Sequence, residues 1–201
     1  KEKGYLDTDV KVKEERDDSL LNSVKLRFDI IRNKKVKIQN ITFSGNSSVK
    51  SSKLRKLLEN TKRRRKIFSS SKFITKDYED DKQNIIKYYN TIGLRDDKIV
   101  SDSIWRGKNK HLNIHLKIDE GNRYYFRNIS WKGNSIYDVE ALNKVLGISK
   151  GEVFNQELLE NRLRFSQDGR DISSLYLDNG YLFFQVDPQE KVVTKDSIDL
   201  D

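Results

Sequence analysis

The chain has 201 residues, of which 35% are charged and 35% hydrophobic, and its formal net charge is +9. This composition is too highly charged for one large core and favours several small domains in a row. No apolar run approaches the roughly 18 to 20 residues that a membrane-spanning helix needs. The absence of cysteine excludes disulfides, thiolate metal sites and thiol catalysis. The sequence also lacks methionine, and we expect it to be a piece of a longer protein.

Residues 1–35 predict a hairpin that ends a unit whose start is missing. One strand follows Gly4, and a second strand over residues 24–30 alternates apolar with charged residues. A charged turn over residues 14–22 joins them. The alternation predicts strands with one polar face, and we expect the apolar side chains to face inward.

A stretch of alternating apolar and polar residues, Val36–Asn46, returns 88 residues later as Tyr124–Asn134. Such alternation predicts a strand with one buried face. In both copies the alternation of apolar and polar residues changes phase, before Ile41 in the first and before Ile129 in the second. This change predicts a bulge or bend. Both copies end in Gly-Asn, two residue types that readily turn the chain.

A second marker repeats with nearly the same period. Gly4, Gly93 and Gly180 are 89 and 87 residues apart, and Tyr89 and Tyr176 each stand four residues before a glycine. Two independent markers with one period indicate a structural repeat. The length of the unit fits the lower range of domain sizes.

Residues 36–120 predict a complete unit with the order strand, helix, helix, strand, strand. Ser51 or Ser52 is placed to cap a short helix, and Thr75 to cap a longer second helix. Gly93 is the expected left-handed stop of that second helix.

The last two strands of this unit are predicted over residues 98–105 and 111–119. Residues 121–201 repeat the order of elements, with a strand that opens at Gly180–Val186. The final strand is at best begun near Val192–Ile198. This leaves open whether the unit is incomplete at its C-terminus.

This pattern resembles POTRA domains, the polypeptide-transport-associated modules that precede an outer-membrane β-barrel, and the resemblance covers the whole chain. The matching motifs are strand ends, helix ends, the junction of the units and a helix start: Phe43-Ser44-Gly45-Asn46, Trp131-Lys132-Gly133-Asn134, Tyr89 to Gly93, Tyr176 to Leu182, Asp119 to Tyr124, and Gly151 to Asn155. Among POTRA proteins the chain looks most like the BamA type of the β-barrel assembly machinery. A translocation or two-partner secretion transporter is an alternative of the same class. One departure is Asp168-Gly169, which breaks a helix that many POTRA domains run continuously.

The resemblance implies an α+β fold of tandem domains, each β-α-α-β-β with a three-stranded sheet covered on one face by two helices. Residues 1–35 would be the C-terminal part of a first domain, 36–120 a complete domain and 121–201 a further domain. The implied function is a periplasmic scaffold of an outer-membrane protein. It would bind unfolded outer-membrane proteins and accessory assembly lipoproteins and guide clients to a membrane β-barrel.

A three-stranded sheet leaves an unpaired edge, and such an edge can accept an extended peptide through main-chain hydrogen bonds. In POTRA domains the strand after the second helix is thought to supply it. The resemblance therefore points to two peptide-binding edge strands: Lys98, Ile99, Val100, Ser101, Asp102 and Ser103, and Leu182, Phe183, Phe184, Gln185 and Val186. For each strand, an edge that pairs with nothing is the alternative.

The strongest charge feature is a basic run of five residues: Lys62, Arg63, Arg64, Arg65 and Lys66. Clustered cations attract phosphates, so the run can bind nucleic acid or anionic headgroups. A solvated interdomain loop is the simpler interpretation. In the resembled context we expect contact with an anionic membrane surface. The rival from another function class is a basic α+β nucleic-acid-binding module that uses this run.

The histidines and carboxylates do not predict a catalytic or metal site. His111 and His115 lie on one predicted strand, where four residues separate the rings by roughly 13 Å, too far for one ion. The carboxylates, such as Glu79-Asp80-Asp81 and Asp96-Asp97, cluster beside lysines and arginines, as on a solvated surface. We therefore expect no metal, no cofactor and no enzymatic activity.

Overall fold

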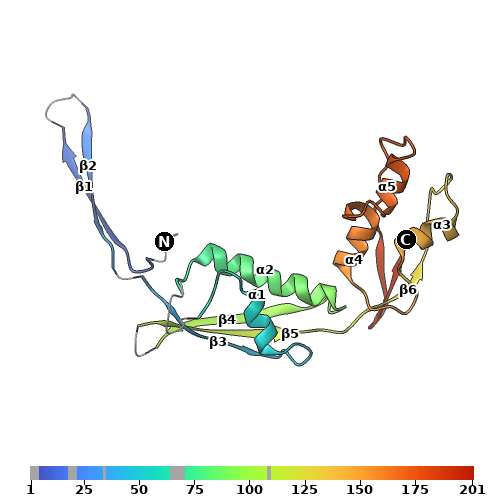
Figure 1. Cartoon of the computed structure of the whole chain (residues 1–201). Coiled ribbons are helices and arrows are strands. Elements are labelled where there is room, and N and C mark those ends of the chain that lie inside the picture. The colour runs from blue at the N-terminus through green and yellow to red at the C-terminus, as the bar shows by residue number, and fades with distance from the viewer. Residues whose placement is uncertain (1–4, 18–21, 34, 64–70, 108–109) are drawn as a thin grey trace. The chain divides into compact units, whose positions relative to one another are not determined.

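A computed structural model describes residues 5–17, 22–33, 35–63, 71–107 and 110–201. The elements form a hairpin followed by two repeats (Figure 1). The chain divides into two compact units: Lys1–Ser44, Val49–Asn84 and Val100–Lys117 in the first, and Gly45–Ser48, Ile85–Ile99 and Ile118–Asp201 in the second.

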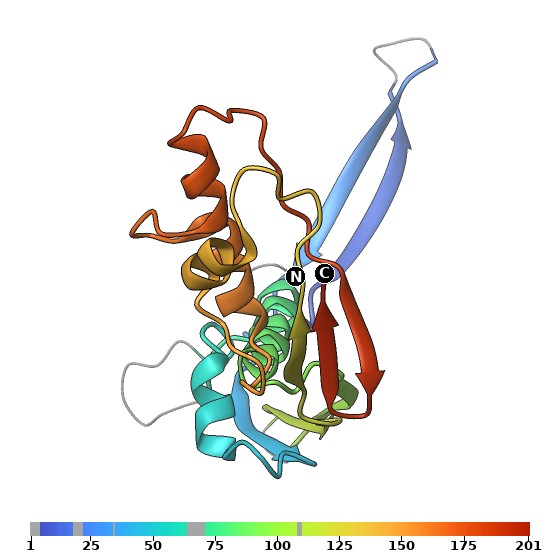
Figure 2. The same ribbon diagram turned by 90° about the vertical axis from the view of Figure 1, so that its right-hand side faces the viewer.

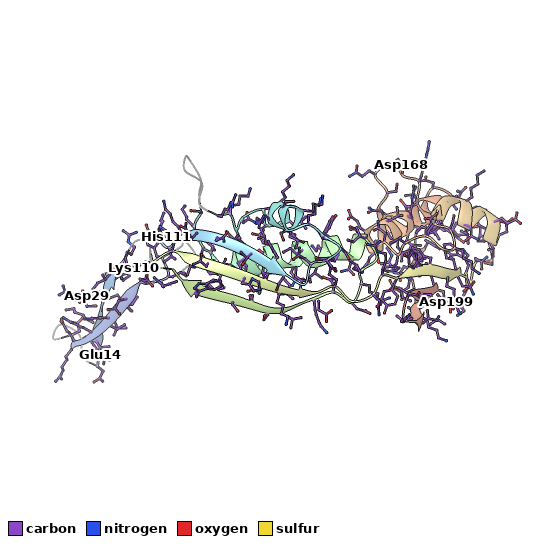
Figure 3. All side chains as sticks on the ribbon, turned by 90° about the horizontal axis from the view of Figure 1, so that it is seen from below. Glu14, Asp29, Lys110, His111, Asp168 and Asp199 are labelled. Atoms are coloured by element: carbon purple, nitrogen blue, oxygen red, sulfur yellow. The ribbon has the colours of Figure 1, made fainter. Side chains whose placement is uncertain are left out.

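The hairpin consists of β1 (Asp9–Arg16) and β2 (Val24–Ile31), which pair in antiparallel register. Apolar residues of the two strands share one face, because Val12 lies opposite Phe28. Side chains project from both strands, Glu14 and Asp29 among them (Figure 3). Phe28 keeps 57% of its surface exposed. The prediction that these apolar side chains face inward is wrong for this structure, because no described element covers the two-stranded ribbon.

The middle repeat has five elements: β3 (Ile38–Ser44), α1 (Ser51–Leu57), α2 (Thr75–Thr91), β4 (Lys98–Arg106) and β5 (Leu112–Asp119). Its sheet has the order β3-β5-β4, with β3 parallel to β5. The register shifts between Ile38 and Asn40, which confirms the bulge predicted before Ile41. Alternate residues of β5, from Leu112 to Ile118, are buried, as expected for a central strand with one face on the core.

The third repeat has β6 (Tyr125–Ile129), α3 (Val139–Leu146), α4 (Gln156–Glu160), the π-helical η1 (Asn161–Phe165), α5 (Ile172–Leu177), β7 (Glu190–Thr194) and β8 (Ser197–Leu200). Its sheet has the order β6-β8-β7, with β8 parallel to β6 and antiparallel to β7. A register shift between Phe126 and Asn128 confirms the second predicted bulge. The helices lie on one side of this sheet (Figure 2) and enclose a core with it. The α+β class and the repeated order of elements are confirmed.

Glycines end the helices where the sequence predicts. Gly93 follows α2 with φ +84°, the left-handed conformation expected of a helix stop. Gly169, with φ +66°, lies between η1 and α5, which confirms the predicted break. The chain becomes helical again at α5, where the side chain of Asp171 accepts a hydrogen bond from Ser174 N–H.

The predicted cap of α1 is wrong. The residue before the helix is Lys50, which makes no side-chain cap hydrogen bond. Ser51 and Ser52 both lie inside the first turn.

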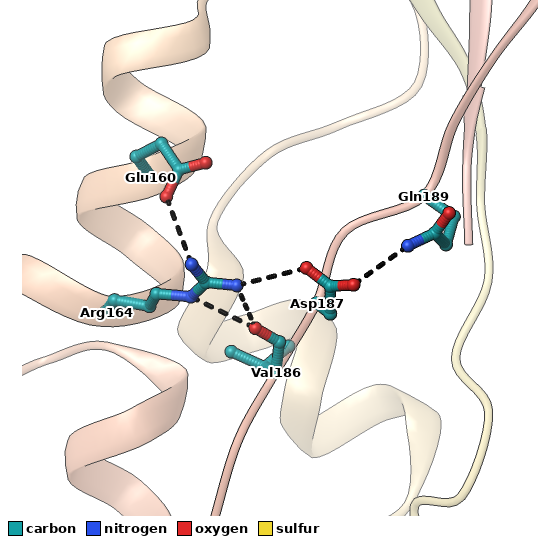
Figure 4. Close-up of polar contacts among 5 residues, drawn as sticks. All are labelled: Glu160, Arg164, Val186, Asp187 and Gln189. Carbon is teal, nitrogen blue, oxygen red and sulfur yellow. Dashed lines mark hydrogen bonds and ion pairs between the residues drawn. The ribbon is translucent and has the colours of Figure 1, made fainter.

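The strand predicted at Gly180–Val186 is not formed. Residues 182–183 lie in a turn, residues 184–189 are irregular, and the sheet resumes at Glu190. In place of strand pairing, the ring of Phe184 stacks on Tyr176 of α5, and the Val186 carbonyl accepts a hydrogen bond from Arg164 of η1 (Figure 4). The last strand, expected only to begin near Val192–Ile198, is formed as β8.

Candidate binding edges

One outer edge of each sheet is paired at its start by another segment of the chain, and it is the same edge in both repeats. In the middle repeat Ile38 N–H donates to the Ser71 carbonyl (2.9 Å). In the third repeat Phe126 N–H donates to the Glu152 carbonyl (2.9 Å). In each case a segment that precedes the second helix lies against the first strand. This pairing occupies the start of β3 and of β6 and so shortens the edge that each strand leaves open.

The opposite edge of the middle sheet, β4, is uncovered. The order β3-β5-β4 leaves one side of β4 without a strand among the described residues. Every residue of this nine-residue strand except Ile99 is exposed, including Val100 (50%) and Trp105 (49%). A long, exposed, partly apolar edge is the kind that accepts an extended peptide. All six residues predicted over 98–103 lie in it.

Two charged side chains of β4 form ion pairs with neighbouring elements. Lys98 lies 3.4 Å from Asp119, and Asp102 lies 2.7 Å from Lys82 of α2. Lys82 also pairs with Glu79 at 2.9 Å. Charged side chains along an edge hinder its pairing with a second copy of the same sheet.

The second predicted segment is not an edge strand, and the outer strand of the third sheet is β7 instead. Its Val192 and Val193 are exposed. Within the predicted segment, Phe183 is 96% exposed, whereas the ring of Phe184 stacks on Tyr176 with centroids 3.8 Å apart. The two consecutive phenylalanines therefore have different surroundings.

Only the start of the basic run falls within the described residues. Lys62 and Arg63 are exposed, and Arg64, Arg65 and Lys66 lie outside the described residues. Binding of a membrane or of nucleic acid by this run stays a prediction.

The segment that leads to the basic run is fixed by Asp81 of α2. Its carboxylate accepts hydrogen bonds from the backbone N–H groups of Glu59 (2.9 Å), Asn60 and Thr61. The side chain is fully buried. The expectation that it belongs to a solvated surface is wrong, because these N–H groups compensate for the lost water.

Glu120 is a buried carboxylate whose role sequence reasoning missed. It accepts hydrogen bonds from Ser47 Oγ (2.7 Å), Ser48 N–H (2.8 Å) and the Tyr89 hydroxyl (2.9 Å). All four residues belong to the second compact unit. Burial raises the pKa of Glu120, but these hydrogen bonds outweigh burial and hold the pKa below its ordinary value. The sequence signal that points to this site is the tyrosine that stands four residues before a glycine in both repeats, because Tyr89 donates its hydroxyl to Glu120.

Asp97 is buried without such partners. It is 9% exposed, and neither carboxylate oxygen has a hydrogen-bond partner within the described part of the chain. Burial raises the pKa of Asp97, and the charges of Asp96 and Glu120 raise it further, to about 7. The expectation of a solvated Asp96-Asp97 pair is therefore wrong for Asp97.

The histidines occupy polar positions around β5. The ring of His115 lies between two hydroxyls, 3.0 Å from Thr42 Oγ1 and 3.0 Å from Ser44 Oγ. His111 precedes the strand beside Lys110 (Figure 3). Among the residues that the structure describes, no three histidine or carboxylate groups converge to hold a metal ion. No helix within the described ranges is long and apolar enough to cross a membrane.

Comparison with protein families finds both repeats. A family model named POTRA, described as a surface antigen variable number repeat, matches residues 36–121 and 124–201. A curated protein of Treponema pallidum (strain Nichols), named as an outer membrane protein assembly factor, is 24% identical over 163 residues. That match covers 79% of this chain, and the chain spans only 18% of the relative's length.

Solved structures share the fold. The POTRA3-5 region of Haemophilus influenzae BamA matches with a TM-score of 0.52 and 18% identity, over 98% of this chain and 72% of that one. BamA from Haemophilus ducreyi lacking POTRA domains 1-3 matches with a TM-score of 0.58 and 16% identity, over 82% of this chain and 28% of that one. At these identities the likeness concerns the fold alone.

Proposed function

The chain belongs to the POTRA family, and from this premise we propose that it is part of the periplasmic scaffold of an outer-membrane protein assembly factor. In this role a free strand edge binds extended segments of unfolded outer-membrane proteins. Other surfaces hold accessory lipoproteins, and clients pass to a membrane β-barrel elsewhere in the protein. The name of the Treponema pallidum relative supports this role.

The observation that carries the proposal is the open edge of β4. The chain itself pairs with the start of β3 and of β6, whereas eight of the nine residues of β4 are exposed. Main-chain hydrogen bonds along such an edge require an extended partner but no particular side chains. This suits a scaffold that has to bind many different clients.

The side chains of β4 favour a partner strand that carries both apolar and polar residues. Val100, Ile104 and Trp105 offer exposed apolar surface, while Lys98 and Asp102 are engaged in ion pairs. Strands of outer-membrane barrels alternate apolar and polar residues. The apolar side of such a strand can therefore contact Val100 and Ile104, which share one face of β4, while its backbone pairs with β4.

The test is an NMR titration of the isotope-labelled chain with a peptide from an outer-membrane barrel strand. We expect amide shifts confined to residues 98–106. The matched control is the same peptide with its alternate backbone amides N-methylated, which removes donors and blocks strand pairing while the side chains stay unchanged. Equal binding of both peptides would contradict the proposal.

Proline variants of the protein give a second test. Successive N–H groups of a strand point to opposite sides, so one of Val100→Pro and Ser101→Pro removes only the outward donor and leaves pairing with β5 intact. We expect the variant that keeps its folded circular dichroism spectrum to bind the peptide at least about tenfold more weakly. The matched pair Val192→Pro and Val193→Pro in β7 shows whether the third sheet binds as well.

A parallel titration with an RNA oligomer addresses the rival function. Shifts at Lys62 and Arg63 with RNA, together with none in β4 with peptide, would favour the nucleic-acid-binding module. Such binding should weaken steeply with salt, because it releases counterions.

A further inference from the structure

The third repeat has a basic cleft between β6 and the C-terminal end of α3 (Figure 1). Its volume is about 590 Å³, which is within the range of small-molecule sites. Three cationic side chains line it, Arg127, Lys144 and Lys150, and none of its lining residues is acidic. All of these residues belong to the second compact unit.

The middle repeat fills the corresponding place with an arginine. Its first helix begins 88 residues before α3, which is the period of the repeats, so Arg55 corresponds to Asn143. In the same way Ile41 corresponds to Ile129. Arg55 Nε donates to the Ile41 carbonyl (3.2 Å) and so reaches from α1 to β3. The shorter Asn143 instead accepts a hydrogen bond from Trp131 Nε1 (2.8 Å), which leaves the cleft between α3 and β6 open.

The loop after the first helix binds an anion in the middle repeat. There, the N–H groups of residues 59–61 donate to the buried carboxylate of Asp81. The corresponding residues of the third repeat are Gly147, Ile148 and Ser149, and all three line the cleft. Among the described residues, the N–H groups of Ile148 and Ser149 have no acceptor, and no carboxylate takes the place of Asp81.

The charge of the cleft favours an anion. Arg127 uses two of its five N–H donors on Asp199, with Nε 2.7 Å from Oδ1, and three donors remain. Lys144 and Lys150 are exposed, and neither has an ion pair or hydrogen bond within the described ranges. Three cations and the one carboxylate of Asp199 leave a net charge of two. The C-terminal end of α3 contributes a negative charge of about half a unit, which reduces this excess without reversing it.

We propose that this cleft binds a phosphate group, carried by a soluble phosphate ester or by a lipid headgroup. A phosphate monoester has roughly 1.5 to 2 negative charges at pH 7, which matches the net charge of the cleft, whereas one carboxylate would neutralise only half of it. The two lysines supply compact ammonium groups, and Arg127, held by Asp199, supplies directional N–H donors. Neutral polar groups are left for the rest of the ester: Asn128, Asn143 and Ser149.

The first test is an NMR titration of the isotope-labelled chain with glycerol 3-phosphate at constant ionic strength. We expect amide shifts centred on residues 147–150, and weaker binding at higher salt because the contacts are between charges. Shifts spread evenly over the exposed lysines of the chain would overturn the site.

Charge variants distinguish a site from an effect of net charge. Lys144→Gln combined with Lys150→Gln should weaken binding by at least about tenfold. The matched control, Lys191→Gln combined with Lys195→Gln, removes the same charge from exposed positions of the third repeat that do not line the cleft, and its binding should stay within about twofold. Ser149→Glu supplies a carboxylate from the chain itself and should abolish binding. Equal weakening in the two double variants, or unchanged binding in Ser149→Glu, would overturn the proposal, and circular dichroism shows that each variant keeps its fold.

Vesicles identify the source of the phosphate. The chain is sedimented with phosphatidylcholine vesicles that contain or lack phosphatidic acid. Binding that requires phosphatidic acid and is lost in the Lys144→Gln and Lys150→Gln double variant would support a lipid headgroup. Binding of glycerol 3-phosphate without binding of vesicles would support a soluble ester, and binding of neither would overturn the proposal. None of these outcomes depends on peptide binding at β4.

Discussion

Asp97 and Glu120 are both buried carboxylates, and their surroundings move their pKa values in opposite directions. Burial raises the pKa of each, but Glu120 accepts hydrogen bonds from two hydroxyls and a backbone N–H, which lower its pKa. Asp97 has no hydrogen-bond partner among the described residues and faces the charges of Asp96 and Glu120. Hydrogen bonds to the ionised carboxylate therefore explain why the pKa of Glu120 is lowered and that of Asp97 is raised.

The raised pKa of Asp97 predicts a pH-dependent stability. Because this pKa rises from 3.8 to about 7 on folding, the folded state holds a proton that the unfolded state releases. The contribution to stability is full below about pH 4 and is lost as pH rises through 7. We expect Asp97→Asn to raise the free energy of unfolding at pH 8 by about 1 to 3 kcal/mol and to flatten this dependence.

Urea unfolding at pH 5 and pH 8 measures the effect, with Asp80→Asn at an exposed position as the control. An unchanged pH dependence in Asp97→Asn would show that another group carries the titration.

At the scale of elements, the same alternation gives either a core strand or an exposed ribbon. Phe28 of β2 is 57% exposed and Phe126 of β6 is fully buried, although both stand in alternating strands. Phe126 also packs on Phe154, with ring centroids 5.2 Å apart. How much each phenylalanine contributes to the free energy of unfolding therefore depends on whether another element packs over its strand.

This difference in burial predicts that replacing the two phenylalanines by alanine lowers the free energy of unfolding by unequal amounts. Phe126→Ala creates a cavity and should lower the free energy of unfolding by about 3 to 5 kcal/mol, whereas Phe28→Ala should cost less than about 1 kcal/mol. Urea unfolding followed by circular dichroism compares the two. A cost of Phe28→Ala close to that of Phe126→Ala would mean that the face of the hairpin is covered in solution.

At the scale of the whole molecule, the hairpin of β1 and β2 corresponds to the pairs β4-β5 and β7-β8, which are the last two strands of their repeats. We propose that residues 1–35 are the last two strands of another repeat, ahead of repeats at 36–120 and 121–201. Their exposed apolar face then corresponds to the buried faces of the other two sheets.

Removal of residues 1–35 should therefore leave the rest folded. We expect the shortened chain to keep its thermal transition and to bind less of the dye ANS, because exposed apolar residues of β1 and β2 are lost. Differential scanning calorimetry and dye fluorescence measure both effects. Loss of the folded transition would contradict the division into domains.

The sequence by itself determined the period, the order of elements, both bulges and the helix stop at Gly93. These features follow from local alternation and from the conformational freedom of glycine. The β4 edge was also predictable, since it follows from the family resemblance and the position of the strand after the second helix. The sequence did not reveal the pairing at the start of β3 and of β6, the burial of Asp81 and Asp97, or the hydrogen bonds of Glu120.

Only the tertiary structure decided these features, because each depends on segments distant in the sequence. The segment Gly180–Val186 shows the physical reason most clearly. Its residues favour a strand, but in the structure the ring of Phe184 stacks on Tyr176 and the Val186 carbonyl accepts a hydrogen bond from Arg164, so the segment is held by helices rather than by a neighbouring strand.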